Sequence, residues 1–298
     1  MMPLGELAAL GTAVCWAVGS NLFAAAGRRL GSALLNRLRI SLALVYLTLA
    51  LWAIRGAPWP FWATGSQVGV LAVSGLVGFV FGDLYYFRSL VILGPGRAAL
   101  LASLAPPMTA VLAWPLLGEL PGRLAIVGMA LTIGGVFWVL SEQEHRRHAS
   151  VEGSAAVGIV AGIFGSLGQA GGYVLSKLAL RTGLDPLSAT VVRIVTATAG
   201  VWLLALGQRG PWWPSEVLRD RQAWMFTAAG AFSGPFLGVT LSLVALNYIE
   251  AGVAASITAC YPVLTILISA RFHGEQLTWR LLLGALVTVA GVGVLFLR

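Results

Sequence analysis

Ten long apolar stretches, separated by short polar gaps, make up most of the chain. They cover approximately residues 5–26, 37–54, 67–92, 98–117, 124–140, 154–180, 187–207, 223–247, 252–271 and 280–297. A helix needs about 20 mostly apolar residues to cross a bilayer, and backbone groups in lipid must bond within the protein. The stretches exceed the roughly 10 residues of a barrel strand and lack strand-like alternation. The pattern therefore predicts an all-α membrane protein with ten transmembrane helices.

The polar gap at 141–152 divides the chain near its midpoint, and the two sides resemble each other. A shift of 156 residues places GPGRAALLASLAPPMTAVLAWPLLGE on EAGVAASITACYPVLTILISARFHGE. The shift pairs Pro106 with Pro262, Glu119 with Glu275, and several glycines with one another. We therefore divide the chain into a first repeat (1–140), a connecting loop (141–152) and a second repeat (153–298). Since each repeat holds five helices, an odd number, the second is expected to cross the membrane upside down, as in many secondary transporters.

Composition supports a membrane location and narrows the possible partners. Of the 298 residues, 58% are hydrophobic and 10% charged, against about 25% charged in soluble domains. The net charge of +8 comes mostly from arginines in the polar gaps, and no basic patch with interleaved aromatics indicates nucleic acid. Cys15 and Cys260 lie in apolar stretches without the spacing of a disulfide framework or metal site. We expect a multi-pass protein of the plasma (inner) membrane that needs no cofactor.

Two segments carry a family resemblance that covers nearly the whole chain. PLLGELPGRLAIVGMALTIGGV and FHGEQLTWRLLLGALVTVAGV resemble the closing signature of the EamA domain in the drug/metabolite transporter superfamily. Arg39 and Arg193, which open the second helix of each repeat, also resemble the family pattern. The resemblance implies a pseudo-symmetric ten-helix bundle around a central cavity, and export or exchange of small metabolites such as amino acids or drugs by alternating access. Pro121 and Asp83 have no counterpart in the other repeat, so the halves need not treat a substrate alike.

Asp83 is an acidic residue well inside the third stretch, in FVFGDLYYFRSL. An ionised aspartate at the centre of a spanning helix costs roughly 2.5–3.5 kcal/mol, so it must face a wet cavity, meet a cation or hold a proton. Arg88 lies about 140° around the helix and does not face it, whereas Arg39 or Arg193 could pair with it from another helix. Two interpretations stay open: a site for a substrate amine or a coupling proton, or a structural ion pair.

The sixth stretch carries a polar stripe that predicts a cavity lining. Gln169, Tyr173 and Lys177 follow one another at spacings of four residues and so share one helix face. A polar stripe facing lipid would be costly, so this face is expected to point into the bundle. Lys177 is close to the helix end and could instead extend to the membrane interface.

Further substrate contacts are predicted on three other stretches, each with a packing role as its alternative. Tyr86 lies one turn after Asp83, and Tyr261 precedes Pro262, whose missing N–H interrupts a helix. The remaining substrate-contact candidates are Trp16 and Asn21 in the first stretch and Arg88 in the third. Glu119 and Glu275 lie at the membrane edge, where a carboxylate can complement the positive N-terminus of a helix.

Other functional classes find less support in the sequence. The three histidines lie in polar gaps, and no G-x-S-x-G or P-loop motif is present, so an intramembrane enzyme is disfavoured. A passive pore or a membrane sensor stays open as an alternative to a transporter. The arginine count is eleven in the gaps on one side and four on the other, which places both termini outside the cytoplasm. The family resemblance implies cytoplasmic termini, so the orientation also stays open.

Overall fold

The fold was analysed in a computed structural model, which describes residues 3–93, 98, 101–146, 155–207, 220–273 and 278–297. Within these residues all regular structure is helical. The helices of the first repeat are α1 (Leu4–Leu30), α2 (Ser32–Arg55), α3 (Gly65–Gly75), η1 (Leu76–Gly82), α4 (Asp83–Leu93), α6 (Ala105–Leu117) and α7 (Arg123–Arg146). The last of these, α7, continues into the segment expected as a connecting loop at 141–152. Those of the second repeat are α8 (Ala155–Leu180), α9 (Pro186–Leu206), α10 (Arg221–Ala231), η3 (Phe232–Gly238), α11 (Val239–Tyr248), α12 (Ala251–Thr258), α13 (Tyr261–His273) and α14 (Trp279–Phe296).

Local sequence signals set several of the helix ends. Thr64 and Gln67 form a capping box at the start of α3, in which each side chain accepts the backbone N–H of the other. Asp185 caps α9 ahead of Pro186, and Asp220 caps α10. The Ala223 N–H and the Arg29 guanidinium hold the pKa of Asp220 below its usual range.

The described residues include eight helices long and apolar enough to cross a membrane, together with two shorter apolar segments. The expected spans at 98–117 and 252–271 are these shorter segments, since each is interrupted by a turn, at 103–104 and at 259–260. Each turn lies just before a proline, Pro106 or Pro262, which cannot donate to the preceding helical turn. The prediction of ten transmembrane helices is therefore confirmed only in part.

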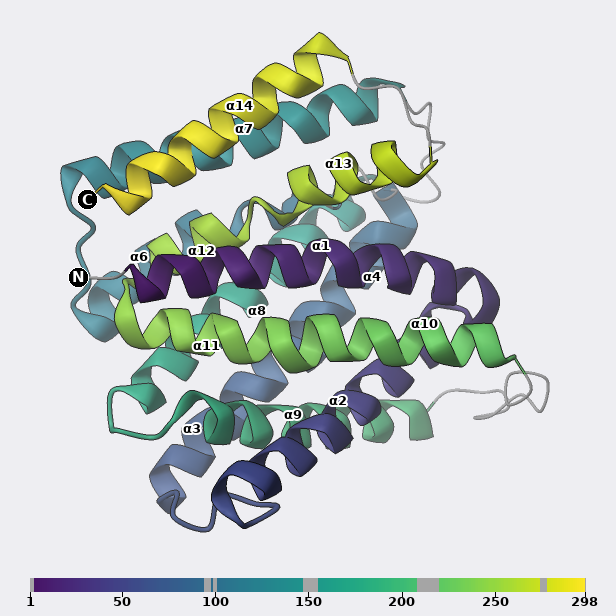
Figure 1. Cartoon of the computed structure of the whole chain (residues 1–298), viewed down its shortest axis with the longest axis vertical. Helices are drawn as coiled ribbons and strands as arrows, with labels where there is room; N and C mark the ends of the chain where they lie inside the picture. Colours follow the sequence, from purple (N-terminus) through teal and green to yellow (C-terminus); the bar gives the residue numbers. More distant parts are fainter. Residues whose placement is uncertain are drawn as a thin grey trace.

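Two pairs of helices that correspond between the repeats pack side by side and run in opposite directions. α7 lies along α14 at one edge of the molecule (Figure 1). Gly128, near the start of α7, faces Gly291 near the end of α14, and Gly135 faces Gly284. Under the repeat shift Gly128 corresponds to Gly284 and Gly135 to Gly291. Exchanging the two halves therefore turns the Gly128–Gly291 contact into the Gly135–Gly284 contact. α2 packs on α9 in the same manner.

Further contacts follow the same exchange. α8 packs against α3, η1 and α4, and α1 packs against α10, η3 and α11. The two π-helical segments also correspond, because Leu76–Gly82 and Phe232–Gly238 differ by 156 at both ends. A π-helical turn is rare, so its recurrence in one register shows that the duplication extends to backbone irregularities.

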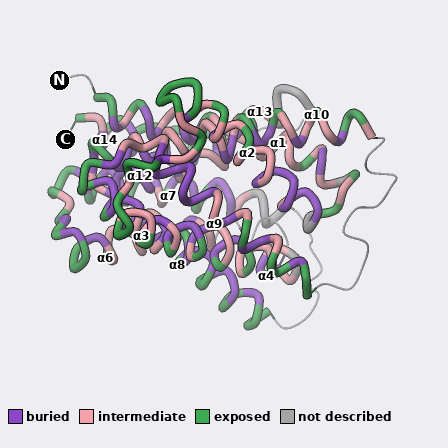
Figure 2. The backbone as a smooth tube through the Cα atoms, turned by 90° about the horizontal axis from the view of Figure 1, so that it is seen from below, coloured by how far each residue is buried: buried purple, intermediate pink, exposed green. Residues whose placement is uncertain are grey.

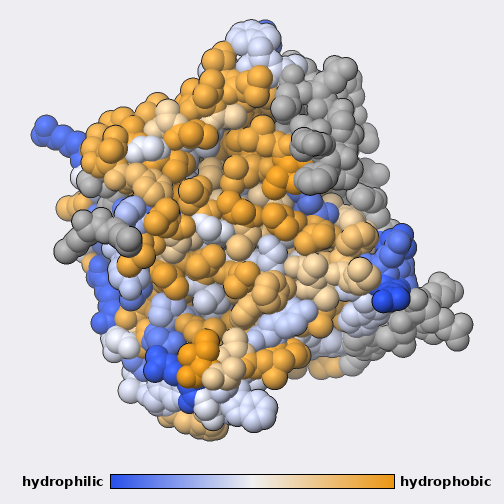
Figure 3. Space-filling view, in the orientation of Figure 1, coloured by the Kyte–Doolittle hydropathy of each residue, from blue (hydrophilic) through white to orange (hydrophobic). Residues whose placement is uncertain are grey.

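Large apolar side chains cover the outside of the bundle. Leu49, Val111, Leu203 and Leu286 are each more than half exposed. Buried and exposed positions alternate along the helices, which turn one face inward and one outward (Figure 2). Hydrophobic atoms dominate the middle of the face in Figure 3, while hydrophilic atoms gather at the left and right edges. This arrangement is that of an integral, multi-pass membrane protein.

Candidate functional site

A cavity of about 190 Å³ lies where the two repeats meet. Its walls come from α1, α2, η1 and α4, α6, α7, α8, α9, α11, and the interrupted segments around Pro106 and Pro262. Many lining positions correspond under the repeat shift. The pairs are Asp83 and Val239, Tyr86 and Ser242, Ala102 and Thr258, Ser103 and Ala259, Ala105 and Tyr261, and Pro106 and Pro262. The two halves thus supply equivalent backbone positions, and except for the two prolines these positions carry different side chains.

Asp83 forms a buried ion pair with Arg39 in this cavity. Arg39 Nη2 lies 2.7 Å from Asp83 Oδ2, and about 10% of each side chain is exposed. Arg39 Nε also donates to Asn36 Oδ1, and its guanidinium lies over the rings of Phe23 and Phe87. Of the two arginines that the sequence offered as partners, the structure selects Arg39. The Asp83 carboxylate is thereby neutralised.

Arg193 lines the same cavity without a carboxylate partner among the residues described. The residue is only 5% exposed, and its Nε is buried without a hydrogen-bond partner. Its guanidinium lies 4.9 Å from the ring centroid of Phe79. A Cβ added at Gly78 or Gly172 would lie 3.3 or 3.4 Å from Arg193 Nη2, so these glycines leave space for the guanidinium.

The other predicted candidates divide into those that line the cavity and those that do not. Those that line it are Trp16, Tyr86, Gln169, Tyr173 and Tyr261. Tyr173 faces the hydroxyls of Ser242 and Thr258.

Three candidates lie outside this lining. Arg88 is exposed, because five residues from Asp83 place it on another helix face. Asn21 donates to the Ala17 carbonyl of its own helix. Lys177 extends to a polar cluster near the start of α1 rather than into the cavity.

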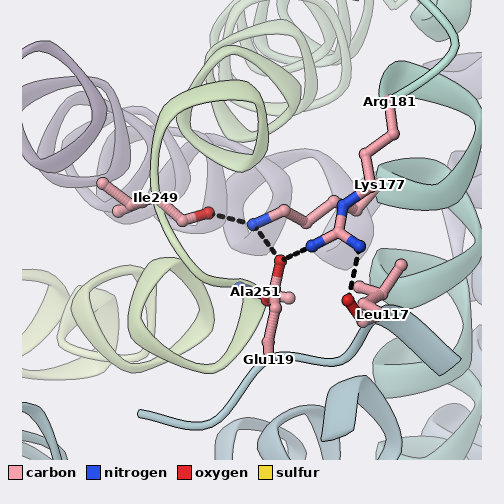
Figure 4. Close-up of polar contacts among 6 residues, drawn as sticks. All are labelled: Leu117, Glu119, Lys177, Arg181, Ile249 and Ala251. Carbon is pink, nitrogen blue, oxygen red and sulfur yellow. Dashed lines mark hydrogen bonds and ion pairs between the residues drawn. The ribbon is translucent and has the colours of Figure 1, made fainter. Parts of the chain in front are cut away.

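That cluster is centred on Glu119, a residue of the first repeat held by groups of the second (Figure 4). Glu119 Oε1 lies 2.6 Å from Lys177 Nζ and 2.7 Å from Arg181 Nη2, and Oε2 accepts the Ala251 N–H at 2.8 Å. Lys177 also donates to the Ile249 carbonyl. Glu119 therefore complements the N-terminus of α12, while Glu275 lies outside the described residues. The cluster ties the repeats together at one end of the bundle.

Several lining residues were not predicted. Phe79 and Phe87 lie four residues before and after Asp83, so helical spacing alone could have placed them beside it. Ser242 is the repeat counterpart of Tyr86, and applying the repeat shift to that candidate would have found it. Thr258 corresponds only to Ala102, and no local signal distinguishes it.

The model of the EamA-like transporter family matches residues 3–141 and 156–297. The chain belongs to the EamA-like transporter family. The two matches confirm the resemblance found in the closing segments of the repeats, and they place the chain in the drug/metabolite transporter superfamily. As an EamA protein, the chain combines a duplicated helical domain with a cavity lined by both copies.

A solved crystal structure of another protein has the same overall fold as this EamA chain. The TM-score is 0.79 over 97% of this chain and 95% of the other, at 17% sequence identity. At that identity the likeness concerns the fold alone. No curated protein matches the sequence.

Proposed function

We propose that the protein is a secondary active transporter of small solutes in the plasma membrane, working by alternating access between two inverted repeats. The observation that carries this proposal is the cavity, because equivalent positions of both repeats form its walls. Inverted repeats around a shared site allow a fold to open to either side by exchanging the conformations of its halves. The proposed substrate contacts are the cavity-lining candidates Trp16, Asp83, Tyr86, Gln169, Tyr173 and Tyr261.

Antiparallel packing of equivalent helices supports the inverted arrangement. α7 against α14 and α2 against α9 each pair a helix with its own counterpart, running the opposite way. An operation that exchanges such partners is a two-fold rotation about an axis perpendicular to the helices. If the helices cross the membrane, this axis lies in the membrane plane, and the repeats enter from opposite sides.

The Glu119 cluster supports a mechanism in which one end closes while the other opens. Its carboxylate is 8% exposed and joins α8 and α12 of the second repeat to the loop that follows α6. Breaking a buried ion pair by removing one partner costs about 3–5 kcal/mol, so this contact can hold one end closed. Alternating access requires that the contact forms and breaks in each cycle.

Reconstituted protein tests this proposal directly. We expect saturable uptake into liposomes, accelerated by unlabelled solute inside, for at least one compound in a panel of labelled amino acids and small carboxylates. Linear, non-saturating flux would instead show a pore, and a chemically altered compound would show an enzyme.

A matched pair of variants tests the cluster. Glu119→Gln keeps the side-chain shape but leaves Lys177 without its counter-charge, so exchange should fall about tenfold or more as the closed state loses stability. Glu142→Gln is the control, because the Glu142 carboxylate pairs with the mostly exposed Arg280 at 3.7 Å and does not belong to the Glu119 cluster. Equal exchange by wild type and Glu119→Gln would remove the closing role of the cluster.

A further inference from the structure

The cavity carries an unbalanced positive charge. Among its lining residues are two guanidiniums, those of Arg39 and Arg193, and one carboxylate, that of Asp83. Asp83 is occupied by Arg39 at 2.7 Å. Within the described residues that line the cavity, Arg193 is therefore the arginine whose charge is not matched.

The surroundings of Arg193 are suited to holding a guanidinium in place for an incoming anion. Phe79 packs against one face, while the missing side chains of Gly78 and Gly172 let Nη2 pack closely on these two residues. A buried charge is costly without a counter-charge, and a carboxylate can accept two parallel hydrogen bonds from one guanidinium. The buried Nε, which lacks a partner, is one of the donors for such a contact.

The remaining lining indicates the rest of the ligand. Trp16, Phe79, Phe87, Pro106 and Pro262 supply rings and apolar surface, beside hydroxyl and amide groups such as those of Tyr86, Gln169 and Tyr173. The volume of about 190 Å³ is somewhat larger than the roughly 150 Å³ of an engineered apolar cavity that holds benzene. A ring-sized apolar body therefore fits, whereas a ligand ammonium would find the Asp83 carboxylate already engaged.

We propose that the cavity binds small organic monocarboxylates with a ring-sized apolar body, and that Arg193 receives the carboxylate. This inference rests on the proposed transport function for its physiological meaning, and it names the substrate class. A site for cations or zwitterions would instead need a carboxylate that is free to pair with the ligand ammonium.

Calorimetric titration of the purified, full-length protein with five compounds tests the inference. Benzoate is the carboxylate, benzyl alcohol the neutral analogue, benzylamine the cation, phenylglycine the zwitterion, and acetate the anion without a ring. Benzoate should bind at least about tenfold more tightly than each of the others, since hydrogen bonds to a charged group contribute about 1.5–3 kcal/mol. Equal binding of benzyl alcohol, or preference for benzylamine or phenylglycine, would overturn the proposal, and equal binding of acetate would overturn the ring-sized body.

Variants assign the effect to one arginine. Arg193→Gln should lose the benzoate preference about tenfold or more, and Arg193→Lys should retain part of it. Arg37→Gln is the matched control, because Arg37 is also a buried arginine over an aromatic ring, that of Trp202, but does not line the cavity. An unchanged preference in folded Arg193→Gln would refute the assignment. Should that variant elute as aggregate, the wild-type ligand series decides the question alone.

The binding experiment and the flux experiment fail independently. Benzoate binding without exchange would sustain the anion site and refute the transporter. Saturable exchange of amino acids or cations without benzoate binding would sustain the transporter and refute the anion site.

Discussion

At the residue scale, the ion pair between Asp83 and Arg39 determines what the cavity can hold. Placed in a span, either charge alone would be expensive, and the 2.7 Å contact gives each charged group a partner of opposite sign. Arg39 is further held by Asn36 and by two aromatic rings. The two opposite charges of the pair balance each other in the wall, and the remaining positive charge of the cavity lies on Arg193.

A double-mutant cycle tests this pairing. Asp83→Asn leaves the Arg39 guanidinium buried without its carboxylate, which should destabilise the protein by up to about 3–5 kcal/mol. Arg39→Gln should be destabilising for the converse reason, and the double variant should recover a large part of the loss. Thermal unfolding of the four proteins in one detergent measures the coupling. Additive losses would show that the two groups do not stabilise each other.

The same cycle separates the two interpretations that the sequence left open for Asp83. A double variant that regains both stability and exchange would make the pair purely structural. A double variant that is stable but does not exchange solute would place the pair in the transport step.

The sequence indicates which buried residues need a partner, because that need depends on the residue itself. It does not indicate which residue of a distant helix supplies the partner. The free-energy cost of an ionised group in a spanning helix indicated that Asp83 needs a partner. Whether Arg39 or Arg193 is that partner depends on how the helices are rotated against each other. The stripe on α8 likewise placed Gln169 and Tyr173 at the cavity. Lys177 lies on the same stripe, yet its long side chain reaches Glu119 of the other repeat.

At the element scale, glycine contacts allow α8 to approach the helices around η1 closely. A Cβ added at Gly168 would lie 2.7 Å from the Cα of Gly82, and one at Gly172 would lie 3.0 Å from the Cα of Gly78. Backbones this close bring Asp83 and Gln169 to one cavity wall. The four-residue spacing of Gly78 and Gly82 is typical of such helix contacts.

Gly168→Ala tests this close packing against a matched control. The new methyl group must push the two backbones apart, and overpacking of this kind costs about 1–3 kcal/mol. Gly134→Ala is the control, because a Cβ at that position of α7 meets nothing within 4 Å. It should be neutral or slightly stabilising, since alanine is the better helix former. Thermal unfolding checks both, and equal midpoints would contradict the packing argument.

Sequence pattern located the helices better than it described their interiors. Proline chemistry predicted the interruption before Pro262, which is present, and Pro106 produces its counterpart. Nothing in the apolar pattern indicated η1 or η3, because a π-helical turn shifts hydrogen bonds by one residue without changing which residues are apolar. The identical residues that η1 and η3 share under the repeat shift are two glycines, Gly78 and Gly82 in η1 and Gly234 and Gly238 in η3.

At the scale of the whole molecule, the duplication determines where the cavity lies. Glycines, a proline and a glutamate recur at a spacing of 156 residues, and this spacing was enough to predict two equivalent halves. The repeat does not predict which surfaces of the two halves meet. It also does not predict that Glu119 joins them at one end, because both depend on tertiary packing. The orientation in the membrane stays a prediction, because the arginine count and the family resemblance point in opposite directions.

Single cysteines at Gly65 and Arg221 test the inverted arrangement. These residues begin α3 and α10, are exposed, and correspond under the repeat shift, so inverted repeats place them on opposite sides of the membrane. After Cys15 and Cys260 are replaced by alanine, a membrane-impermeant maleimide should label only one of the two variants in intact cells and both after lysis. Labelling of both variants in intact cells, or of neither, would mean that the repeats run the same way. The variant that is labelled also shows the orientation in the membrane. If every apolar segment crosses the membrane, residue 65 lies on the same side as both termini. A variant at position 65 that the maleimide does not label in intact cells would therefore place the termini in the cytoplasm.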